Sequence, residues 1–228
     1  MLISEVFYSL QSEGAYTGRP CVFIRTAGCN LRCIWCDTPY TSWSPRGETR
    51  TVAQLMADTE VWREVKHVAI TGGEPMLQKD VAQLVDALKE RGHFVAIETA
   101  GTIYDDEVRP DFFSISPKLH NSYPGREHDK ELRIHRANNT CDQLSRFIDS
   151  GVDYQFKFVL QDDGDTEEVL SMISRFRIDR EKVFLVPEGT SAEQVRSRAL
   201  AVSDICKREG LAYSGRLQID LWGNTRGT

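Results

Sequence analysis

The sequence has no long apolar run. The longest stretches of that kind among its 228 residues, such as "FKFVL", are far too short to cross a bilayer. The N-terminal "MLISEVFYSLQSEG" also lacks the basic leader and apolar core of a secretion signal. We therefore expect a protein of the cytoplasm, where thiols stay reduced.

The sequence also lacks a surplus of basic residues and has little cysteine. Asp and Glu total 34 against 28 Lys and Arg, which gives a net charge of -6. This balance argues against tight binding of nucleic acid through a broad basic surface, but it does not exclude a nucleotide-like small molecule. With only six cysteines in a reducing compartment, structural disulfides are not expected. Cysteines that cluster then predict metal ligation or redox chemistry.

The remaining composition is that of an ordinary globular protein. Hydrophobic residues make up 40% and charged residues 27%, and the length favours one domain over residues 1–228. Short runs rich in Val, Ile and Phe predict strands. These strands are expected at residues 21–27, 67–71, 94–99, 111–116, 154–160, 182–187 and 215–220.

Amphipathic stretches between these runs predict helices. The helices are expected at residues 51–65, 78–92, 141–150, 166–177 and 191–210. Ser191 and Gln194 have the spacing of a capping box at the start of the last helix. The polar segment 117–140 has no clean period and is expected to be a loop or an inserted turn.

The alternation of strands and helices predicts an α/β fold with right-handed βαβ units and a parallel sheet. Several strands are apolar on both faces, as in a sheet that is covered on both sides. Periodicity alone leaves two architectures open, a doubly wound sheet and an incomplete (β/α) barrel.

Unusual residues gather where the predicted strands end. "TGGEP" ends the second strand, "ETAG" the third, "SPK" the fourth and "PEG" the sixth. Parallel α/β folds bind their ligands at this edge of the sheet. We expect "TGGEP" to be part of a ligand site, whereas "PEG" is typical of a simple strand end.

Three cysteines follow the first predicted strand within eight residues, in "CNLRCIWC". A structural zinc site needs four ligands, and none of the other cysteines is placed to supply the fourth. A thiol–disulfide pair would use only Cys33 and Cys36 and would leave Cys29 without a role. An iron–sulfur cluster held by three thiolates, with one iron open to another ligand, fits the spacing best.

This spacing resembles the CxxxCxxC signature of the radical S-adenosylmethionine superfamily. The resemblance implies that Cys29, Cys33 and Cys36 bind a [4Fe–4S] cluster whose fourth iron is chelated by S-adenosylmethionine. "TGGEP" is similar to the glycine-rich motif that contacts the amino group of this cofactor in the family. Gly72 and Gly73 would let the backbone approach a ligand closely, and Glu74 would accept from the ammonium group.

Features along nearly the whole chain resemble the family of 7-carboxy-7-deazaguanine synthases. They are the opening "QSEG", the cluster loop with "CDT", then "ITGGEP", "IETAG" and "SPK" in order, and the C-terminal "WGNTRG". The resemblance implies a partial (β/α) barrel of parallel strands, with N-terminal and C-terminal extensions that close the site.

It also implies an activity. A reductant such as flavodoxin reduces the cluster, and cleavage of S-adenosylmethionine gives a 5′-deoxyadenosyl radical. This radical takes a hydrogen atom from 6-carboxy-5,6,7,8-tetrahydropterin. Ring contraction with loss of ammonia then gives 7-carboxy-7-deazaguanine, a precursor of 7-deazapurines such as queuosine, with assistance from Mg²⁺. No side chain is assigned as catalytic, because the cofactor radical abstracts the hydrogen. The family further implies a homodimer.

Residue roles follow from the same resemblance. Thr38 is expected to ligate Mg²⁺ beside the substrate carboxylate, with Asp37 close by. The remaining assignments place the cofactor at Gly73, Glu74, Thr99, Ser116 and Lys118. They place the substrate at Gln11, Glu13, Arg25, Thr71, Gln218 and Thr228. Arg25 would form a bidentate pair with the substrate carboxylate, and Glu13 would accept from the donor-rich edge of the pterin.

Two positions depart from the family pattern. Gln218 stands where many relatives have a histidine, and glutamine keeps a donor and an acceptor but cannot carry charge. Ser12 replaces a glycine, which is tolerable where the backbone φ angle is negative. The five histidines lie outside the motifs and are assigned no role.

Three other functions stay open at this stage. An activase that installs a glycyl radical on a partner protein shares the cysteine motif, but it has less use for Arg25, Glu13 and a closing tail. A zinc-stabilised binding module would hold one zinc in place of several irons. A relative with a changed pterin substrate is the third, and Gln218 keeps it open.

Overall fold

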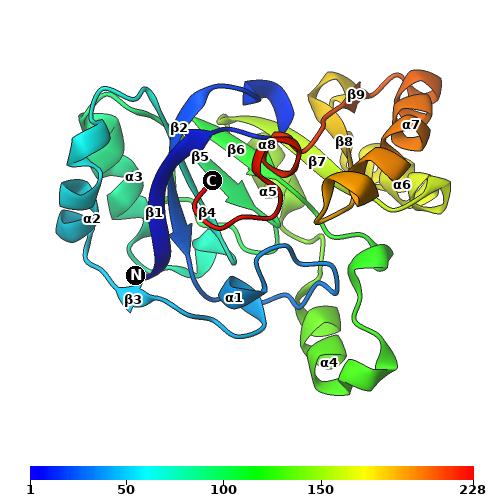
Figure 1. Cartoon of the computed structure of the whole chain (residues 1–228), viewed down its shortest axis with the longest axis horizontal. Coiled ribbons are helices and arrows are strands. Elements are labelled where there is room, and N and C mark those ends of the chain that lie inside the picture. Colours follow the sequence, from blue (N-terminus) through cyan, green and yellow to red (C-terminus); the bar gives the residue numbers. More distant parts are fainter.

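The structure is a computed structural model that describes residues 1–228. Its centre is one nine-stranded sheet (Figure 1). The strands are β1 (Leu2–Leu10), β2 (Pro20–Thr26), β3 (Glu48–Thr49), β4 (His67–Gly72), β5 (Phe94–Thr99), β6 (Phe112–Ile115), β7 (Asp153–Leu160), β8 (Val183–Pro187) and β9 (Ala212–Tyr213).

The strand order is β3-β1-β2-β4-β5-β6-β7-β8-β9. From β2 to β9 every neighbouring pair is parallel, and each strand lies beside the next parallel strand of the sequence. β1 and β3 are antiparallel additions at one edge. A consecutive order has no point at which the winding reverses, unlike a doubly wound sheet. The sheet is therefore an open, incomplete (β/α) barrel, as expected from the family resemblance.

The helices are α1 (Pro39–Ser42), α2 (Val52–Asp58), α3 (Val81–Glu90), α4 (Asp129–Asn138), α5 (Leu144–Asp149), α6 (Thr166–Phe176), α7 (Ala192–Glu209) and α8 (Leu217–Trp222). Helices α2, α3, α5, α6 and α7 pack on the sheet in the main core, whereas α1, α4 and α8 contribute no residue to that core. Alternate strand residues such as Ile70 and Ile97 pack with helix residues such as Leu84 and Phe147 in one cluster of 34 buried side chains. Burying this many apolar side chains is the main favourable contribution to folding. None of the helices is both long enough and apolar enough to span a membrane.

Most of the predicted elements are confirmed. Six of the seven predicted strands and all five predicted helices are present, although the first helix ends at Asp58 and continues only as a short 3-10 turn. The capping box of Ser191 and Gln194 is formed at the start of α7.

The strand predicted at 215–220 is wrong. This segment is α8, in which only Ile219 is buried, and Gly223 ends the helix with a φ of 69°. The sequence "LQIDL" alternates like a strand, but Leu217 and Leu221 are also spaced by one helical turn. The sheet instead ends at the two-residue β9, and the chain turns back over the sheet (Figure 1).

Five further elements were not predicted, namely β1, β3, β9, α1 and α4, and the longest of them are β1 and α4. β1 lies antiparallel to β2 and carries a mixture of apolar and polar residues, of which only Ile3 and Phe7 are buried. The segment 117–140, expected to be a loop, contains α4. Only Leu132 and His135 of α4 are buried, so its apolar period is too sparse to identify a helix.

The inner face of the sheet differs from the expectation of strands that are apolar on both faces. Residues that alternate with the outer core residues become polar toward the carboxyl ends of the strands. In β2 and β4 these are Arg25 and Thr71, which are paired in register. In β5 and β6 they are Glu98 and Ser114, also paired. This polar inner face is the floor of the site.

Candidate active site

A cavity of about 480 Å³ lies over the carboxyl ends of the parallel strands. This volume is in the range of small-molecule sites. Fourteen of the fifteen residues assigned to the site from the sequence line it, and the exception is Glu74. The fourteen are Gln11, Glu13, Arg25, Cys29, Cys33, Cys36, Thr38, Thr71, Gly73, Thr99, Ser116, Lys118, Gln218 and Thr228.

The cluster loop connects β2 to α1 and carries all three candidate thiols. The Sγ of Cys29 accepts from the backbone N–H of Leu31 at 3.3 Å. The Sγ of Cys36 lies 3.3 Å from the Oγ of Ser42, and the indole N–H of Trp43 donates to the carbonyl of Cys33 at 3.0 Å. These local bonds fix a loop that contains no regular secondary structure.

The thiols fit a polynuclear cluster better than a single metal ion. All six cysteines are free, so none is lost to a disulfide. The three thiols do not converge on a preformed metal site, so the preference for a cluster rests on their number: a structural zinc takes four protein ligands, whereas three thiolates hold a cluster with one iron left open. Burial raises the pKa of Cys29 and of Cys33 to about 12, so binding iron there must displace protons.

The glycine motif after β4 packs directly against the cluster loop. The N–H of Gly73 donates to the carbonyl of Thr26 at 3.1 Å, and the N–H of Glu74 donates to the carbonyl of Gly28 at 2.9 Å. A Cβ atom on Gly73 would collide with the Gly28 carbonyl oxygen. Gly72 has a φ of 133°, which L side chains rarely adopt. Both glycines are therefore required for this approach, which leaves the backbone of Gly73 facing the cavity.

Glu74 lies beneath the cavity wall and does not face it. Its side chain is fully buried, and its carboxylate accepts from the hydroxyl of Thr99 at 2.8 Å and from the N–H groups of Ala100 and Met76 at 2.8 and 3.1 Å. Burial raises the pKa of Glu74, and these donors oppose the shift. The expectation that Glu74 accepts from a cofactor ammonium group is not met by this placement. Its carboxylate holds the "ETAG" loop in position.

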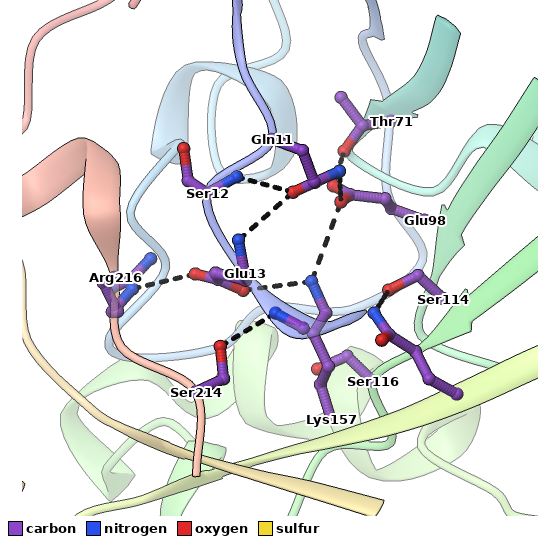
Figure 2. Close-up of polar contacts among 12 residues, drawn as sticks. Gln11, Ser12, Glu13, Thr71, Glu98, Ser114, Ser116, Lys157, Ser214 and Arg216 are labelled. Carbon is purple, nitrogen blue, oxygen red and sulfur yellow. Dashed lines mark hydrogen bonds and ion pairs between the residues drawn. The ribbon is translucent and has the colours of Figure 1, made fainter. Parts of the chain in front are cut away.

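A chain of charged side chains, of which Lys157 and Arg216 are buried and the carboxylates are partly exposed, crosses the floor of the cavity (Figure 2). The carboxylate of Glu13 pairs with the Nζ of Lys157 and with the Nε of Arg216, both at 3.0 Å. Lys157 also lies 3.7 Å from Glu98, and Arg216 pairs at its other end with Asp37. These contacts connect the "QSEG" turn to the cluster loop and to the sheet.

Three of these charged residues, Lys157, Glu98 and Arg216, were not among the predicted site residues. A signal was present for two of them, since Lys157 and Glu98 are single charges inside apolar strands, where charged residues are rarely buried unless paired. Arg216 gave no such signal, because polar and apolar residues alternate in its segment "GRLQID", where a charge is expected on an exposed face.

The charge chain keeps Glu13 ionised and leaves Glu98 as a shared acceptor. Burial raises the pKa of Glu13, but the charges of Lys157 and Arg216 outweigh it and lower that pKa far below its ordinary value. Glu98 accepts from the amide of Gln11 at 3.1 Å and from the hydroxyl of Thr71 at 2.8 Å (Figure 2). The side chains assigned to the substrate are thus already held in place by the protein.

Gln218 has an unused acceptor in the cavity wall. Its Nε2 donates to Glu13 at 3.3 Å. Its Oε1 is buried and has no hydrogen-bond partner, and no other buried side-chain nitrogen or oxygen of the protein lacks one. An unpaired buried acceptor costs about 1–3 kcal/mol. Because Gln218 lines the cavity but this oxygen is shielded from water, a turn of the amide toward the cavity would let it accept from a ligand that brings an N–H or O–H donor.

The guanidinium group of Arg25 is held by Glu5, a residue that no sequence motif indicated. Its Nε donates to the Oε1 of Glu5 at 2.7 Å, and its guanidinium lies 5.4 Å from the centre of the Phe7 ring. The two terminal nitrogens of the guanidinium make no hydrogen bond within the protein. That end remains able to bind a carboxylate in a bidentate pair.

Three further residues singled out in the sequence, Ser116, Lys118 and Ser12, have defined contacts. The Nζ of Lys118 donates to the Oγ of Ser116 at 2.7 Å and lies 5.7 Å from the Trp35 ring, so these two polar residues form one group. Ser12 does not have a positive φ, and its hydroxyl donates to the carbonyl of Leu10 at 2.9 Å. Serine is therefore tolerated where relatives have glycine.

Comparison with known proteins gives consistent matches. The profile of the Radical SAM superfamily matches residues 23–177. The 7-carboxy-7-deazaguanine synthase of Rhodopirellula baltica is 41% identical over all of this chain and 89% of the relative. The enzyme of the same name from Halobacterium salinarum is 37% identical over 97% of this chain and 90% of the relative.

Solved structures share the fold. QueE from Escherichia coli superposes with a TM-score of 0.65 at 24% identity and covers 95% of this chain and 93% of its own. Streptococcus suis SuiB, solved bound to S-adenosylmethionine, gives a TM-score of 0.57 at 14% identity over 82% of this chain and 48% of its own. These likenesses establish the architecture but carry no argument about substrate.

Proposed function

Since the chain belongs to the Radical SAM superfamily and, within it, to the 7-carboxy-7-deazaguanine synthases, we propose the following use of the cavity. It binds 6-carboxy-5,6,7,8-tetrahydropterin beside S-adenosylmethionine and a [4Fe–4S] cluster, and the pterin is converted to 7-carboxy-7-deazaguanine with loss of ammonia. The observation that carries the proposal is one cavity in which three free thiols face a polar wall with unused binding groups.

Cys29, Cys33 and Cys36 hold the cluster. The cluster and S-adenosylmethionine, when bound, supply the radical that removes a hydrogen atom from the pterin. The protein's part is to place the substrate against that radical and to keep water away from it. Tail residues from Gly223 to Thr228 contribute to the lining on the side of the cavity away from the sheet.

The cofactor is assigned to the wall formed by the glycine motif and the ends of β5 and β6. The backbone of Gly73, the hydroxyls of Thr99 and Ser116 and the ammonium group of Lys118 offer donors and acceptors to its amino acid and ribose groups. Glu74 supports this wall from below through its bond to Thr99.

The substrate is assigned to the charged floor. The free end of Arg25 pairs with the substrate carboxylate, and the Oε1 of Gln218 accepts from an N–H group of the pterin. Gln11, Glu13 and Thr71 line the same region. Thr228 places the C-terminal carboxylate at the cavity, where it is a further acceptor for the donor-rich ring.

Mg²⁺ is assigned to the hydroxyl of Thr38 together with the substrate carboxylate and water. Asp37 pairs with Arg216, so it orients the loop from outside the coordination sphere. Bound Mg²⁺ commonly keeps several water ligands and takes oxygen ligands from the substrate. A coordination sphere with one protein ligand is consistent with this preference.

We extend the proposal to the domain organisation, assembly, electron donor and compartment of the enzyme. Residues 1–228 act as a single radical SAM unit, and two chains form a homodimer. An electron donor such as flavodoxin reduces the cluster, without direct contact of the enzyme with nucleic acid. The cytoplasm is the proposed compartment, because three cluster thiols must remain reduced.

An anaerobic assay tests the central proposal. Untagged, cluster-reconstituted protein is incubated with S-adenosylmethionine, Mg²⁺, a reductant and carboxytetrahydropterin, and the products are identified by liquid chromatography with mass detection. We expect 7-carboxy-7-deazaguanine from the wild type and none from Cys33→Ala. Formation of 5′-deoxyadenosine without the deazaguanine would leave the radical chemistry standing and would overturn the substrate.

A further inference from the structure

The last six residues, Gly223–Thr228, form a tail that lines the cavity without belonging to the sheet or to a helix. Only Gly223 makes a backbone–backbone hydrogen bond, with its N–H donating to the carbonyl of Ile219. The hydroxyls of Thr225 and Thr228 bond to carbonyls three residues back. The backbone of residues 224–228 therefore does not hold the tail against the rest of the protein.

One side chain of the tail makes most of the contacts to the rest of the protein. The Nε of Arg226 pairs with the Oε2 of Glu5 at 3.2 Å. Its Nη2 donates to the carbonyl of Ser4 at 2.7 Å, and its guanidinium lies 4.6 Å from the centre of the Tyr40 ring. Its Nη2 also lies 3.1 Å from the hydroxyl of Ser4, and the only other tail residue that bonds outside the tail and α8 is Asn224, whose Nδ2 lies 3.5 Å from the carbonyl of Asp37.

Glu5, on β1, receives this arginine and two further groups. Its Oε1 accepts from the Nε of Arg25 at 2.7 Å and from the hydroxyl of Tyr40 at 2.9 Å. The side chains of Arg25 and Glu5 are 17% and 12% exposed, so their charge-assisted bond is largely shielded from water, whereas Arg226 is 50% exposed and its bond to Glu5 is shielded on the Glu5 side only. One carboxylate thus joins the inner strand, the helix after the cluster loop and the tail.

We propose that Glu5 is a positioning residue for the reaction, which sets Arg25 for the substrate carboxylate and at the same time fastens the tail over the cavity through Arg226. The proposal rests on the proposed function. By occupying the Nε of Arg25, Glu5 directs the free end of that guanidinium to the substrate. By binding Arg226, it keeps Thr228 at the cavity. Glu5 itself touches neither substrate nor cofactor.

Trypsin cleavage after Arg226 tests the fastening without any activity measurement. Trypsin must take the Arg226 side chain into its own specificity pocket, so cleavage requires that Arg226 first leave Glu5. Loss of Gly227 and Thr228 is followed by intact mass under brief digestion. We expect Glu5→Gln to lose this dipeptide about tenfold faster than the wild type, because a charge-assisted bond is weakened.

Glu60→Gln is the matched control, because Glu60 pairs with Arg91 on the surface far along the chain from the tail. It should leave cleavage after Arg226 at the wild-type rate. Equal cleavage rates in Glu5→Gln and wild type would overturn the fastening role. Thermal melting and iron content of Glu5→Gln are measured alongside, so that a general loss of folding is recognised by faster cleavage at all sites.

Kinetics test the positioning role. We expect Glu5→Gln to raise the KM for the pterin about tenfold, with the affinity for S-adenosylmethionine unchanged, because only the substrate side loses its alignment. Adding Arg226→Ala to Glu5→Gln should bring little further loss, since both substitutions break one contact. Arg226→Lys should restore part of the affinity that Arg226→Ala loses.

A wild-type KM for the pterin in Glu5→Gln would overturn the positioning role. The two proposals fail separately. If the wild-type protein makes no 7-carboxy-7-deazaguanine, the proposed function fails, while the trypsin experiment still decides whether Glu5 fastens the tail.

Discussion

Glu13 is the residue on which the charges of the cavity converge. Its carboxylate is shared by Lys157 and Arg216, and its pKa lies far below the ordinary value of 4.5. Such a group stabilises the folded state at pH values above 4.5 and loses that contribution as the pH falls. At neutral pH, Glu13→Gln removes the anion that Lys157 and Arg216 share and leaves each with one other carboxylate, Glu98 or Asp37, so we expect a cost of at most about 3 kcal/mol.

We therefore expect the stabilities of wild type and Glu13→Gln to converge on acidification. Urea unfolding measured at several pH values from neutral to about pH 3 checks this, with the wild type losing its advantage below its carboxyl's unfolded pKa. A difference that stays constant over this range would show that Glu13 does not act through its charge.

Gln218 leads to a prediction about substrate affinity. If its free Oε1 accepts from the pterin, Gln218→Leu removes one hydrogen bond from the complex and raises the KM for the pterin about tenfold. Gln218→His keeps a donor and an acceptor and should retain most of the affinity. Binding of S-adenosylmethionine, measured by calorimetry, should be the same in all three proteins. An unchanged KM in Gln218→Leu would remove Gln218 from the substrate site.

The residues that sequence patterns predicted are those whose chemistry is marked by spacing or by an unusual type. Cys29, Cys33 and Cys36 are close in the chain, so a motif was enough. Glu5 and Arg216 act through partners about 20 to 200 positions away, and no local pattern encodes such pairs. Glu74 was placed in the right loop, but burial and three donors direct its carboxylate away from the cavity, and burial is set by the whole fold.

At the scale of elements, the unpredicted helix α4 supports the cluster loop. The Nδ1 of His135 accepts from the N–H of Arg32 at 3.1 Å, and its Nε2 lies 3.1 Å from the hydroxyl of Ser122. His135 is fully buried. Burial, together with the charges of Lys118 and Arg32, lowers its pKa to about 4.

The buried His135 predicts a second loss of stability at acid pH. Its cause is a histidine that gains a charge on protonation, whereas Glu13 loses one. A histidine whose pKa is lowered by folding destabilises the folded state as the pH falls from its unfolded value of 6.5 toward 4. We expect the wild type to lose stability over that window and His135→Asn, which keeps an acceptor but cannot titrate, to lose less. Thermal melting across the window measures this, and identical curves would contradict the assignment.

The glycine motif makes a steric prediction for the loop after β4. In Gly73→Ala the new Cβ would collide with the carbonyl of Gly28, so the two loops must separate. We expect binding of S-adenosylmethionine to weaken at least about tenfold. Gly215→Ala is the matched control, since the nearest atom to its Cβ would be 3.9 Å away, and it should bind like the wild type. Equal affinity in both variants would mean that the cofactor does not depend on this approach.

Helices and strands were predictable where apolar residues recur regularly and often enough to mark one buried face. β4, β5 and α3 satisfy this, because each buries most of one face. β1 is an antiparallel strand with few buried residues, α4 buries two side chains, and α8 alternates like a strand. In each of these three, tertiary contacts decide the conformation over the local pattern.

At the scale of the whole molecule, the consecutive order of parallel strands explains why the site is assembled from most of the chain. With β2 to β9 parallel and in sequence order, every loop at a carboxyl end opens on the same edge. β1 and β3 extend the sheet beyond β2. α8 and the tail cross in front of the sheet (Figure 1) and contribute residues to the cavity lining. The alternation of elements predicted this edge, but not the chain segments that cover it.

The cluster should therefore stabilise the whole molecule. Its three thiolates anchor a loop that contacts the glycine motif and, through Asp37, the charged floor, and any group bound only by the folded state raises its stability. We expect the reconstituted protein to hold about four irons per chain with matching sulfide, and to melt several degrees higher than the same protein after iron removal. Cys33→Ala should hold almost no iron and melt at one temperature before and after reconstitution. Cys141→Ala, outside the cavity, should match the wild type. One zinc per chain and no sulfide would contradict the radical enzyme itself, because the electron that starts the reaction enters through the irons.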